Sequence, residues 1–154
     1  GPLTNPANSK YQILGVFDKK WVKIHCEVLR DLGSRHALVV YGEDGLDEIS
    51  LSAKTKIAEL KNGRIKEYTF NPKEYGYNLI NLKDIRGKDA GYNAKQFIKM
   101  LDGKYKKFQH IVELNAGAAL YVGGKTKSLK DGFALSKYVI ENNITKQYLN
   151  KIIS

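Results

Sequence analysis

The residues best suited to chemistry form one acidic segment, residues 43–48, which reads EDGLDE. Within it, adjacent Asp47 and Glu48 offer hard carboxylate oxygens, which suit a Mg²⁺ ion that keeps several waters and bridges to substrate phosphates. Gly42 and Gly45 permit an unusual backbone path around these acids, which strengthens the prediction of a metal site. An acidic surface turn without any ligand has the same composition and is the alternative interpretation.

Other groups that could react are isolated in the sequence. His36 and His110 have no second histidine or cysteine at ligand spacing, and His25 is predicted to be a packing or surface residue. Cys26 is the only cysteine, so it forms no internal disulfide, and we expect it to act as a small apolar residue on a helix. Residues 123–124 are two glycines before a lysine, which suit an anion-binding loop but are explained more simply by the end of a helix. The sequence holds no glycine-rich phosphate loop of the Walker or Rossmann type.

Three elements are predicted to position the acidic segment. Tyr11–Phe17 and Ala37–Tyr41 are short apolar runs typical of buried strands, and Asp18 is a suitable N-cap for a helix between them. The apolar positions of that helix recur at three- and four-residue spacing: Trp21, Ile24, Val28, Leu29 and Leu32, with Gly33 as the stop. Strand, helix and strand form a βαβ unit, and ligands in such parallel sheets bind beyond the carboxyl ends of the strands. The acidic segment follows the second strand and is therefore expected at that edge.

The rest of the chain is predicted to add a hairpin and then helices. Lys56–Leu60 and Arg64–Phe70 alternate around an Asn62-Gly63 turn signal, and an irregular polar stretch follows over residues 71–88. Helices are expected at four further places: Asp89 to Gly103, Phe108–Val122, from Ser128 with Asp131 three residues on, and around Tyr148, Leu149 and Ile152.

The predicted fold class is α/β, with a mixed, mostly parallel sheet, a β-hairpin and C-terminal helices. A parallel sheet is normally covered on both faces and built from more strands than this sequence supplies. We therefore expect the chain to be part of an α/β domain whose other strands come from elsewhere.

Length and composition favour one folded domain. The chain has 154 residues, of which 42% are hydrophobic and 27% charged. No apolar run approaches the roughly 18 residues of a membrane span, and residues 1–10 carry no secretory signal, so a cytoplasmic protein is expected. Met100 is the only methionine, so we expect the chain not to begin at a natural start codon.

The net charge of +10 is unevenly distributed, because residues 1–50 carry −1 and residues 51–154 carry +11. Such a basic half suits nucleic acid, an anionic membrane or a phosphorylated small molecule, while scattered lysines also serve solubility alone. The two dense lysine clusters, within residues 104–107 and 125–130, lack the interleaved aromatics and arginines of a single-strand binding groove. Nucleic acid is therefore not favoured as a partner.

Several segments, in this order, closely resemble the C-terminal half of anthranilate phosphoribosyltransferase: GPLTNPANSKYQILGVF, YGEDGLDEIS, TKIAEL, DIRGKDAGYNAKQF and VELNAGAALYVGGK. The resemblance spans essentially the whole chain. That family transfers a phosphoribosyl group from phosphoribosyl pyrophosphate to anthranilate in tryptophan synthesis. Its fold is similar to the nucleoside phosphorylases, with a small helical domain beside a larger α/β domain, usually in a homodimer. The resemblance implies that residues 1–154 are a partial α/β domain.

The same resemblance implies roles for individual residues. Asp47 and Glu48 match the family's acidic pair that binds Mg²⁺ at the pyrophosphate. Gly1 and Pro2 match the start of the GPLTNPA loop, which lines the anthranilate channel. The implied mechanism is mainly electrostatic, because Mg²⁺ neutralises the departing pyrophosphate while the anthranilate amine attacks the anomeric carbon. No catalytic base among these residues is required.

Departures from the family pattern limit what this chain is expected to do. Tyr41 and Ala53 stand where the family often has His and Gly. The glycine-rich phosphate-binding loop, the anthranilate-binding arginine and the N-terminal helical domain, which the family carries in its N-terminal half, have no match in this sequence. We therefore predict that the chain alone has no appreciable transferase activity and that it associates with itself. A non-catalytic relative that binds nucleic acid and an oligomeric structural protein are the alternatives.

Overall fold

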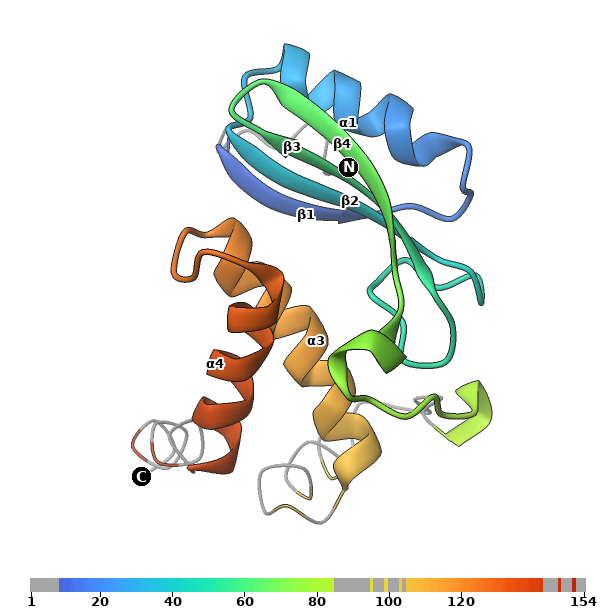
Figure 1. Ribbon diagram of the computed structural model, residues 1–154, viewed down its shortest axis with the longest axis vertical. Coiled ribbons are helices and arrows are strands. Elements are labelled where there is room, and N and C mark those ends of the chain that lie inside the picture. Colours follow the sequence, from blue (N-terminus) through green and yellow to red (C-terminus); the bar gives the residue numbers. More distant parts are fainter. Residues whose placement is uncertain are drawn as a thin grey trace.

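The computed structural model describes residues 9–84 and 105–142, together with positions 95, 99, 103, 147 and 151. A four-stranded sheet lies between helix α1 on one face and helices α3 and α4 on the other (Figure 1). Alternate residues of the sheet point to the two faces: Ala37 and Val39 pack with α1, whereas Leu38 and Val40 pack with α3 and α4. Each face therefore has its own apolar core.

The predicted βαβ unit is confirmed. Strand β1 (Tyr11–Gly15) is followed by α1 (Trp21–Asp31) and by β2 (His36–Gly42), and the two strands pair in parallel. The predicted N-cap at Asp18 is wrong, because Lys20 occupies that position; the Asp18 carboxylate instead accepts a hydrogen bond from the Lys20 N–H at 3.0 Å in the turn before the helix. Gly33 adopts a φ of 91°, which ends the helix as predicted.

The predicted hairpin is also confirmed, in β3 (Thr55–Lys61) and β4 (Arg64–Phe70). Asn62 and Gly63 both have positive φ, 52° and 82°, which matches the tight type I′ turn that an Asn-Gly pair favours. The sheet order is β1-β2-β3-β4, and it is mixed as expected.

The expected majority of parallel pairings is wrong for the described strands, because only β1 and β2 are parallel. Strands β2 and β3 are joined by residues 43–54, which form no helix, and the chain returns directly alongside β2. A parallel neighbour would need a longer crossover connection.

The C-terminal part contains two short 3-10 helices, η2 (Pro72–Tyr75) and η3 (Leu82–Asp84), before α3 (Lys106–Val122) and α4 (Leu129–Glu141). Ser128 caps α4 as predicted, accepting a hydrogen bond from the Asp131 N–H at 3.1 Å. The expected helices over residues 89–103 and around 148–152 lie outside the described residues.

Helices α3 and α4 cross at two glycines. A Cβ atom on Gly132 would lie 2.2 Å from the carbonyl oxygen of Gly117, and one on Gly117 would lie 2.7 Å from the backbone nitrogen of Phe133. Gly117, within the VELNAGAALYVGG segment, and Gly132 therefore allow the two helices to pack closely.

Helix α1 differs from the prediction in the side that it buries. Of the five apolar positions named from the sequence, only Leu29 is buried, together with Val22 and Cys26, whereas the others are exposed: Trp21, Ile24, Val28 and Leu32. Both sets follow helical spacing, so periodicity alone could not show which one faces the sheet. Among the described residues, no helix combines the length and apolar character needed to cross a membrane.

Candidate functional site

The acidic segment lies where the carboxyl ends of the parallel strands β1 and β2 meet, as predicted. A tight turn begins it, with the Gly45 N–H donating to the carbonyl of Gly42 and the Gly42 N–H donating to the carbonyl of Leu46, both at 2.8 Å. Gly45 has a φ of 93°, a conformation that side chains rarely adopt. The Glu43 N–H donates to the Lys54 carbonyl at 2.8 Å and closes the base of the loop.

Asp44 holds the loop together rather than facing a ligand. Its carboxylate accepts hydrogen bonds from the backbone N–H of Leu46, at 3.2 Å, and from the hydroxyl groups of Ser50 and Ser52. Ser50 is buried, and its own oxygen accepts from the N–H groups of Ser52 and Ala53. Asp44 therefore has a structural role within the loop.

Asp47 is fixed against the end of β1 by its backbone. A Cβ atom on Gly15 would lie 1.7 Å from the carbonyl oxygen of Asp47, so only glycine allows the loop to approach the strand this closely. The Asp47 side chain itself is exposed. Its carboxylate has no hydrogen bond or ion pair with the described part of the chain.

Glu48 is half-buried and likewise has no internal donor among the described residues. Burial raises the pKa of its carboxyl group above the usual value, and the neighbouring charges of Asp47 and Asp44 raise this pKa further. Removal from water and like charges both destabilise the ionised form. A cation bound beside Glu48 would stabilise the ionised carboxylate and so oppose both effects on its pKa.

The backbone beside Glu48 is clamped to α3 by a side chain whose role the sequence did not reveal. Asn115 accepts a hydrogen bond from the Ile49 N–H at 3.0 Å and donates to the Ile49 carbonyl, also at 3.0 Å. Its amide donates as well to the Ile111 carbonyl one turn earlier, at 3.1 Å. A single polar residue on an otherwise apolar helix face was the available signal. A pocket of about 350 Å³ adjoins this clamp, lined by Glu48, Phe108, Ile111, Val112, Asn115 and Ala116.

The chemistry of the pair fits Mg²⁺ rather than a metal enclosed by protein ligands. Within the described residues, no group of three or more His, Cys, Asp or Glu side chains is arranged to hold a metal ion. Mg²⁺ commonly binds one or two carboxylates and completes its shell with water and substrate phosphate oxygens. Asp47 and Glu48 are adjacent carboxylates of this kind, and no described residue competes for them.

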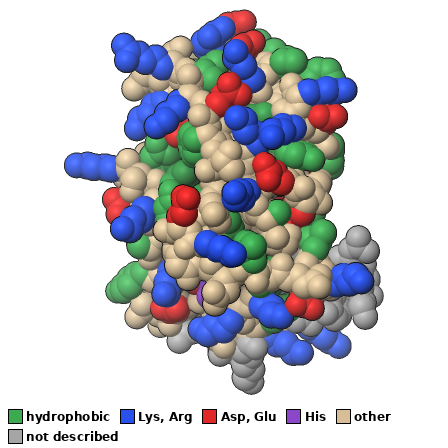
Figure 2. Space-filling view, turned by 45° about the vertical axis from the view of Figure 1, so that its right-hand side comes forward, with side chains coloured by type: hydrophobic (Ala, Val, Ile, Leu, Met, Phe, Trp, Pro, Cys, Tyr) green, Lys and Arg blue, Asp and Glu red, His purple; other side chains and the backbone are tan. Residues whose placement is uncertain are grey.

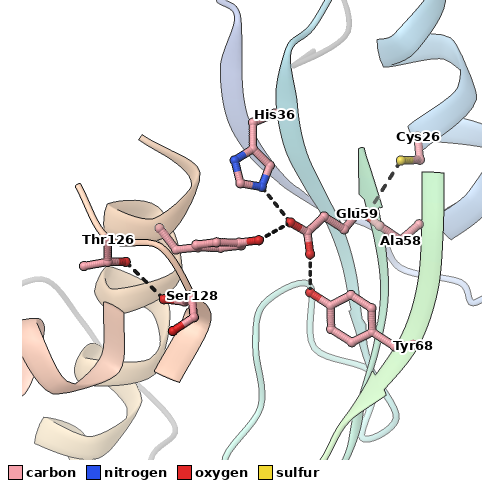
Figure 3. Close-up of polar contacts among 8 residues, drawn as sticks. Cys26, His36, Ala58, Glu59, Tyr68, Thr126 and Ser128 are labelled. Atoms are coloured by element: carbon pink, nitrogen blue, oxygen red, sulfur yellow. Dashed lines mark hydrogen bonds and ion pairs between the residues drawn. The ribbon is translucent and has the colours of Figure 1, made fainter. Parts of the chain in front are cut away.

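A second carboxylate, which the sequence did not single out, has the opposite surroundings (Figure 3). Glu59 on β3 accepts hydrogen bonds from His36 at 2.7 Å, from Tyr68 at 2.8 Å and from Tyr121 of α3 at 2.6 Å. Burial, together with the Glu59 charge, raises the pKa of both tyrosine hydroxyls, so each remains a donor at neutral pH. This group ties the sheet to α3 and has a structural role.

The remaining candidates do not join the acidic site. Cys26 is buried on α1, and burial raises the pKa of its thiol to about 11, which agrees with an unreactive packing residue. His25 lies edge-on to Trp21, and His36 belongs to the Glu59 group. Residues 123–124 end α3, which confirms the simpler explanation of that glycine pair. Gly1 and Pro2, predicted to line an anthranilate channel, lie outside the described residues.

Comparison with known proteins decides the family. Residues 1–144 match the family model described as "Glycosyl transferase family, a/b domain". The chain belongs to this family. It is 46% identical over 156 residues to an anthranilate phosphoribosyltransferase from Marinomonas sp. (strain MWYL1), an alignment that covers 100% of this chain and 45% of that protein. A relative of the same name from Methanobrevibacter smithii is 44% identical, with 99% and 46% covered.

Solved structures agree with this assignment. The crystal structure of anthranilate phosphoribosyltransferase from Thermus thermophilus superimposes with a TM-score of 0.83 at 35% identity, covering 98% of this chain and 44% of that one. The Saccharomyces cerevisiae enzyme in complex with PRPP and Mg has the same fold, with a TM-score of 0.79 at 21% identity. The resemblance drawn from the sequence is thus confirmed for family and fold. The chain spans about half the length of the curated relatives it matches.

Proposed function

We propose that this chain forms part of the α/β domain of an anthranilate phosphoribosyltransferase and contributes the acidic pair that binds Mg²⁺. The observation that carries the proposal is the placement of Asp47 and Glu48. They lie at the carboxyl ends of β1 and β2, held by Gly15 and Asn115, with no internal donor among the described residues. Similarity to relatives of that name across the whole chain supports the same reaction.

In the complete enzyme the substrates are phosphoribosyl pyrophosphate and anthranilate. When bound, Mg²⁺ would neutralise the negative charge that develops on the pyrophosphate leaving group. The residues of this chain contribute position: the Asp44 hydrogen bonds shape the loop, and Asn115 holds the backbone next to Glu48. Gly1 and Pro2 are proposed to line the anthranilate channel. We also propose a cytoplasmic location, from the similarity to biosynthetic enzymes of this name.

The alternative of a nucleic-acid-binding relative is less well supported. Figure 2 shows Lys and Arg side chains spread over the visible face, with Asp and Glu among them, rather than gathered into one basic groove. A strand of nucleic acid is bound through a continuous basic path with stacking aromatics. The acidic pair would repel phosphates at the carboxyl edge of the sheet unless a cation were present.

A chimaera tests the proposal. The matched 45% of the Marinomonas relative is replaced by this chain, and formation of phosphoribosyl anthranilate is measured with Mg²⁺ and both substrates. We expect turnover by the chimaera and none by the 154-residue chain alone. Asp47→Asn and Glu48→Gln in the chimaera should each lower kcat/KM at least about 100-fold, equivalent to about 3 kcal/mol of transition-state stabilisation. A folded but inactive chimaera, or full activity in both variants, would contradict the proposal.

A further inference from the structure

A pocket of about 420 Å³ lies where η2, α3 and α4 meet, and its volume is in the range of sites for small molecules. At about 100° per residue, the pocket residues His110 and Glu113 lie about 140° and 160° around the axis of α3 from Asn115, which holds the backbone beside the acidic pair. The pocket and the acidic pair are therefore on opposite sides of this helix.

Aromatic rings form two walls of the pocket. Tyr75 is 38% exposed, and its ring packs edge-on against Phe133 of α4 at 5.3 Å between centroids. The Tyr77 ring lies edge-on to His110 at 5.2 Å. Gly76, between the two tyrosines, has a φ of 84°, a conformation that other residues rarely adopt. The pocket thus offers fixed aromatic surface, which suits a ligand that carries an aromatic ring.

A buried network keeps this pocket in one shape. Glu113 lines the pocket but is fully buried, and its carboxylate accepts hydrogen bonds from the Tyr77 hydroxyl at 2.9 Å and from the Gln109 amide at 2.7 Å. Burial, together with the Glu113 charge, raises the pKa of the Tyr77 hydroxyl, so it remains a donor at neutral pH. Both donors are neutral, so the carboxylate still attracts a positive group into the pocket.

Three further charged side chains line the same pocket without pairing. Glu74 belongs to η2, whereas Lys130 and Lys137 are two turns apart on one face of α4. None of the three forms an ion pair with a described residue. Opposite charges that line one pocket but do not meet can be bridged by a ligand that carries both signs. Two acids and two lysines also balance, which favours a zwitterion over a phosphorylated ligand with two negative charges.

We propose that this pocket binds a free aromatic α-amino acid. Its ring packs against Tyr75, and its carboxylate lies between Lys130 and Lys137. Its ammonium group faces Glu74 and the negative potential of buried Glu113. The site is additional to the transferase function proposed above and does not depend on it.

Backbone amide shifts of the isotope-labelled chain, titrated with L-phenylalanine, test the site. We expect saturable shifts around Gly76, His110 and Ala134, and none at Asp47 or Glu48, with a dissociation constant on the order of 100 μM. Three probes each lack one group: L-leucine has an aliphatic side chain in place of the ring, phenylpropionate lacks the ammonium group and phenethylamine lacks the carboxylate. Each should bind at least about 5-fold more weakly. Equal binding of L-leucine, or shifts that do not saturate, overturns the proposal.

Two variants assign the charges. Glu74→Gln should weaken L-phenylalanine binding several-fold and leave phenylpropionate unchanged, because that probe has no ammonium group. The Lys130→Gln, Lys137→Gln double variant should weaken both of these ligands and leave phenethylamine unchanged. The matched control is Lys125→Gln with Lys127→Gln, which removes two lysines between α3 and α4, outside the pocket, and should not alter binding.

Circular dichroism verifies that all of these variants are folded. Unchanged affinity for L-phenylalanine in either pocket variant, or an equal loss in the control, overturns the proposal. None of these results depends on transferase activity.

Discussion

Glu48 and Glu59 are carboxylates withdrawn from water in the same small domain, yet only Glu59 has hydrogen-bond donors among the described residues. The Glu59 side chain is 12% exposed and accepts three hydrogen bonds, from His36, Tyr68 and Tyr121. Glu48 faces the charges of Asp47 and Asp44 and has no donor among the described residues, and its carboxyl pKa is raised. Buried charge is stable only when it is partnered. The difference indicates that Glu59 has its partners inside the fold, whereas the partner of Glu48 comes from outside it.

The largest change in the free energy of unfolding is expected from removing Glu59, whose carboxylate accepts three hydrogen bonds inside the fold. Glu59→Ala leaves His36 and two tyrosine hydroxyls without their acceptor in a buried place. We expect the free energy of unfolding in urea to fall by about 3 kcal/mol. A loss below about 1 kcal/mol would show that these donors are readily rehydrated and that the cluster is not structural.

A smaller effect is expected from the clamp beside Glu48. Asn115→Ala removes both hydrogen bonds to the Ile49 backbone and should lower the free energy of unfolding by about 2 kcal/mol. The affinity for Mg²⁺ should fall as well, because the backbone of Ile49, next to Glu48, is no longer held by Asn115. Asn142→Ala is the control, because the Tyr138 carbonyl at the end of α4 is the one acceptor that this exposed side-chain amide has among the described residues. We expect this variant to lose under about 0.5 kcal/mol. Equal losses in the two variants would contradict the clamp.

The smallest effect, and one of opposite sign, is expected at Glu48 itself. Because the folded protein raises the pKa of this group, ionisation opposes folding at neutral pH, and the penalty disappears as pH falls below the ordinary value of 4.5. Glu48→Gln should therefore raise stability at pH 7 by less than about 1 kcal/mol, since solvent screens a half-buried group, and change nothing near pH 4. A loss of stability at pH 7 in Glu48→Gln would show that the Glu48 carboxylate, like that of Glu59, has a partner inside the fold.

The sequence was sufficient for the elements whose signals are local. Apolar runs and the Asn62-Gly63 turn predicted the βαβ unit and the hairpin, and the family pattern pointed to Asp47 and Glu48. The buried side of α1 was mistaken because two apolar rows follow the same period, and only the position of the sheet distinguishes them. Glu59 was missed because a single acid in an alternating strand resembles a solvent-facing residue. Its donors come from β2, β4 and α3, so only the folded chain brings them together.

We propose that the Asp47–Glu48 pair binds a cation, whereas Glu59 does not. Line broadening of backbone amide signals by Mn²⁺, used as a paramagnetic substitute for Mg²⁺, tests this directly on the 154-residue chain. We predict broadening of residues 45–49 and of Gly15, which touches the Asp47 backbone, with signals around Glu59 unaffected. The broadening should be reversed by excess Mg²⁺ and be absent in the Asp47→Asn, Glu48→Gln double variant. Broadening centred on Glu59, or unchanged broadening in the double variant, would show that Asp47 and Glu48 do not form the cation site.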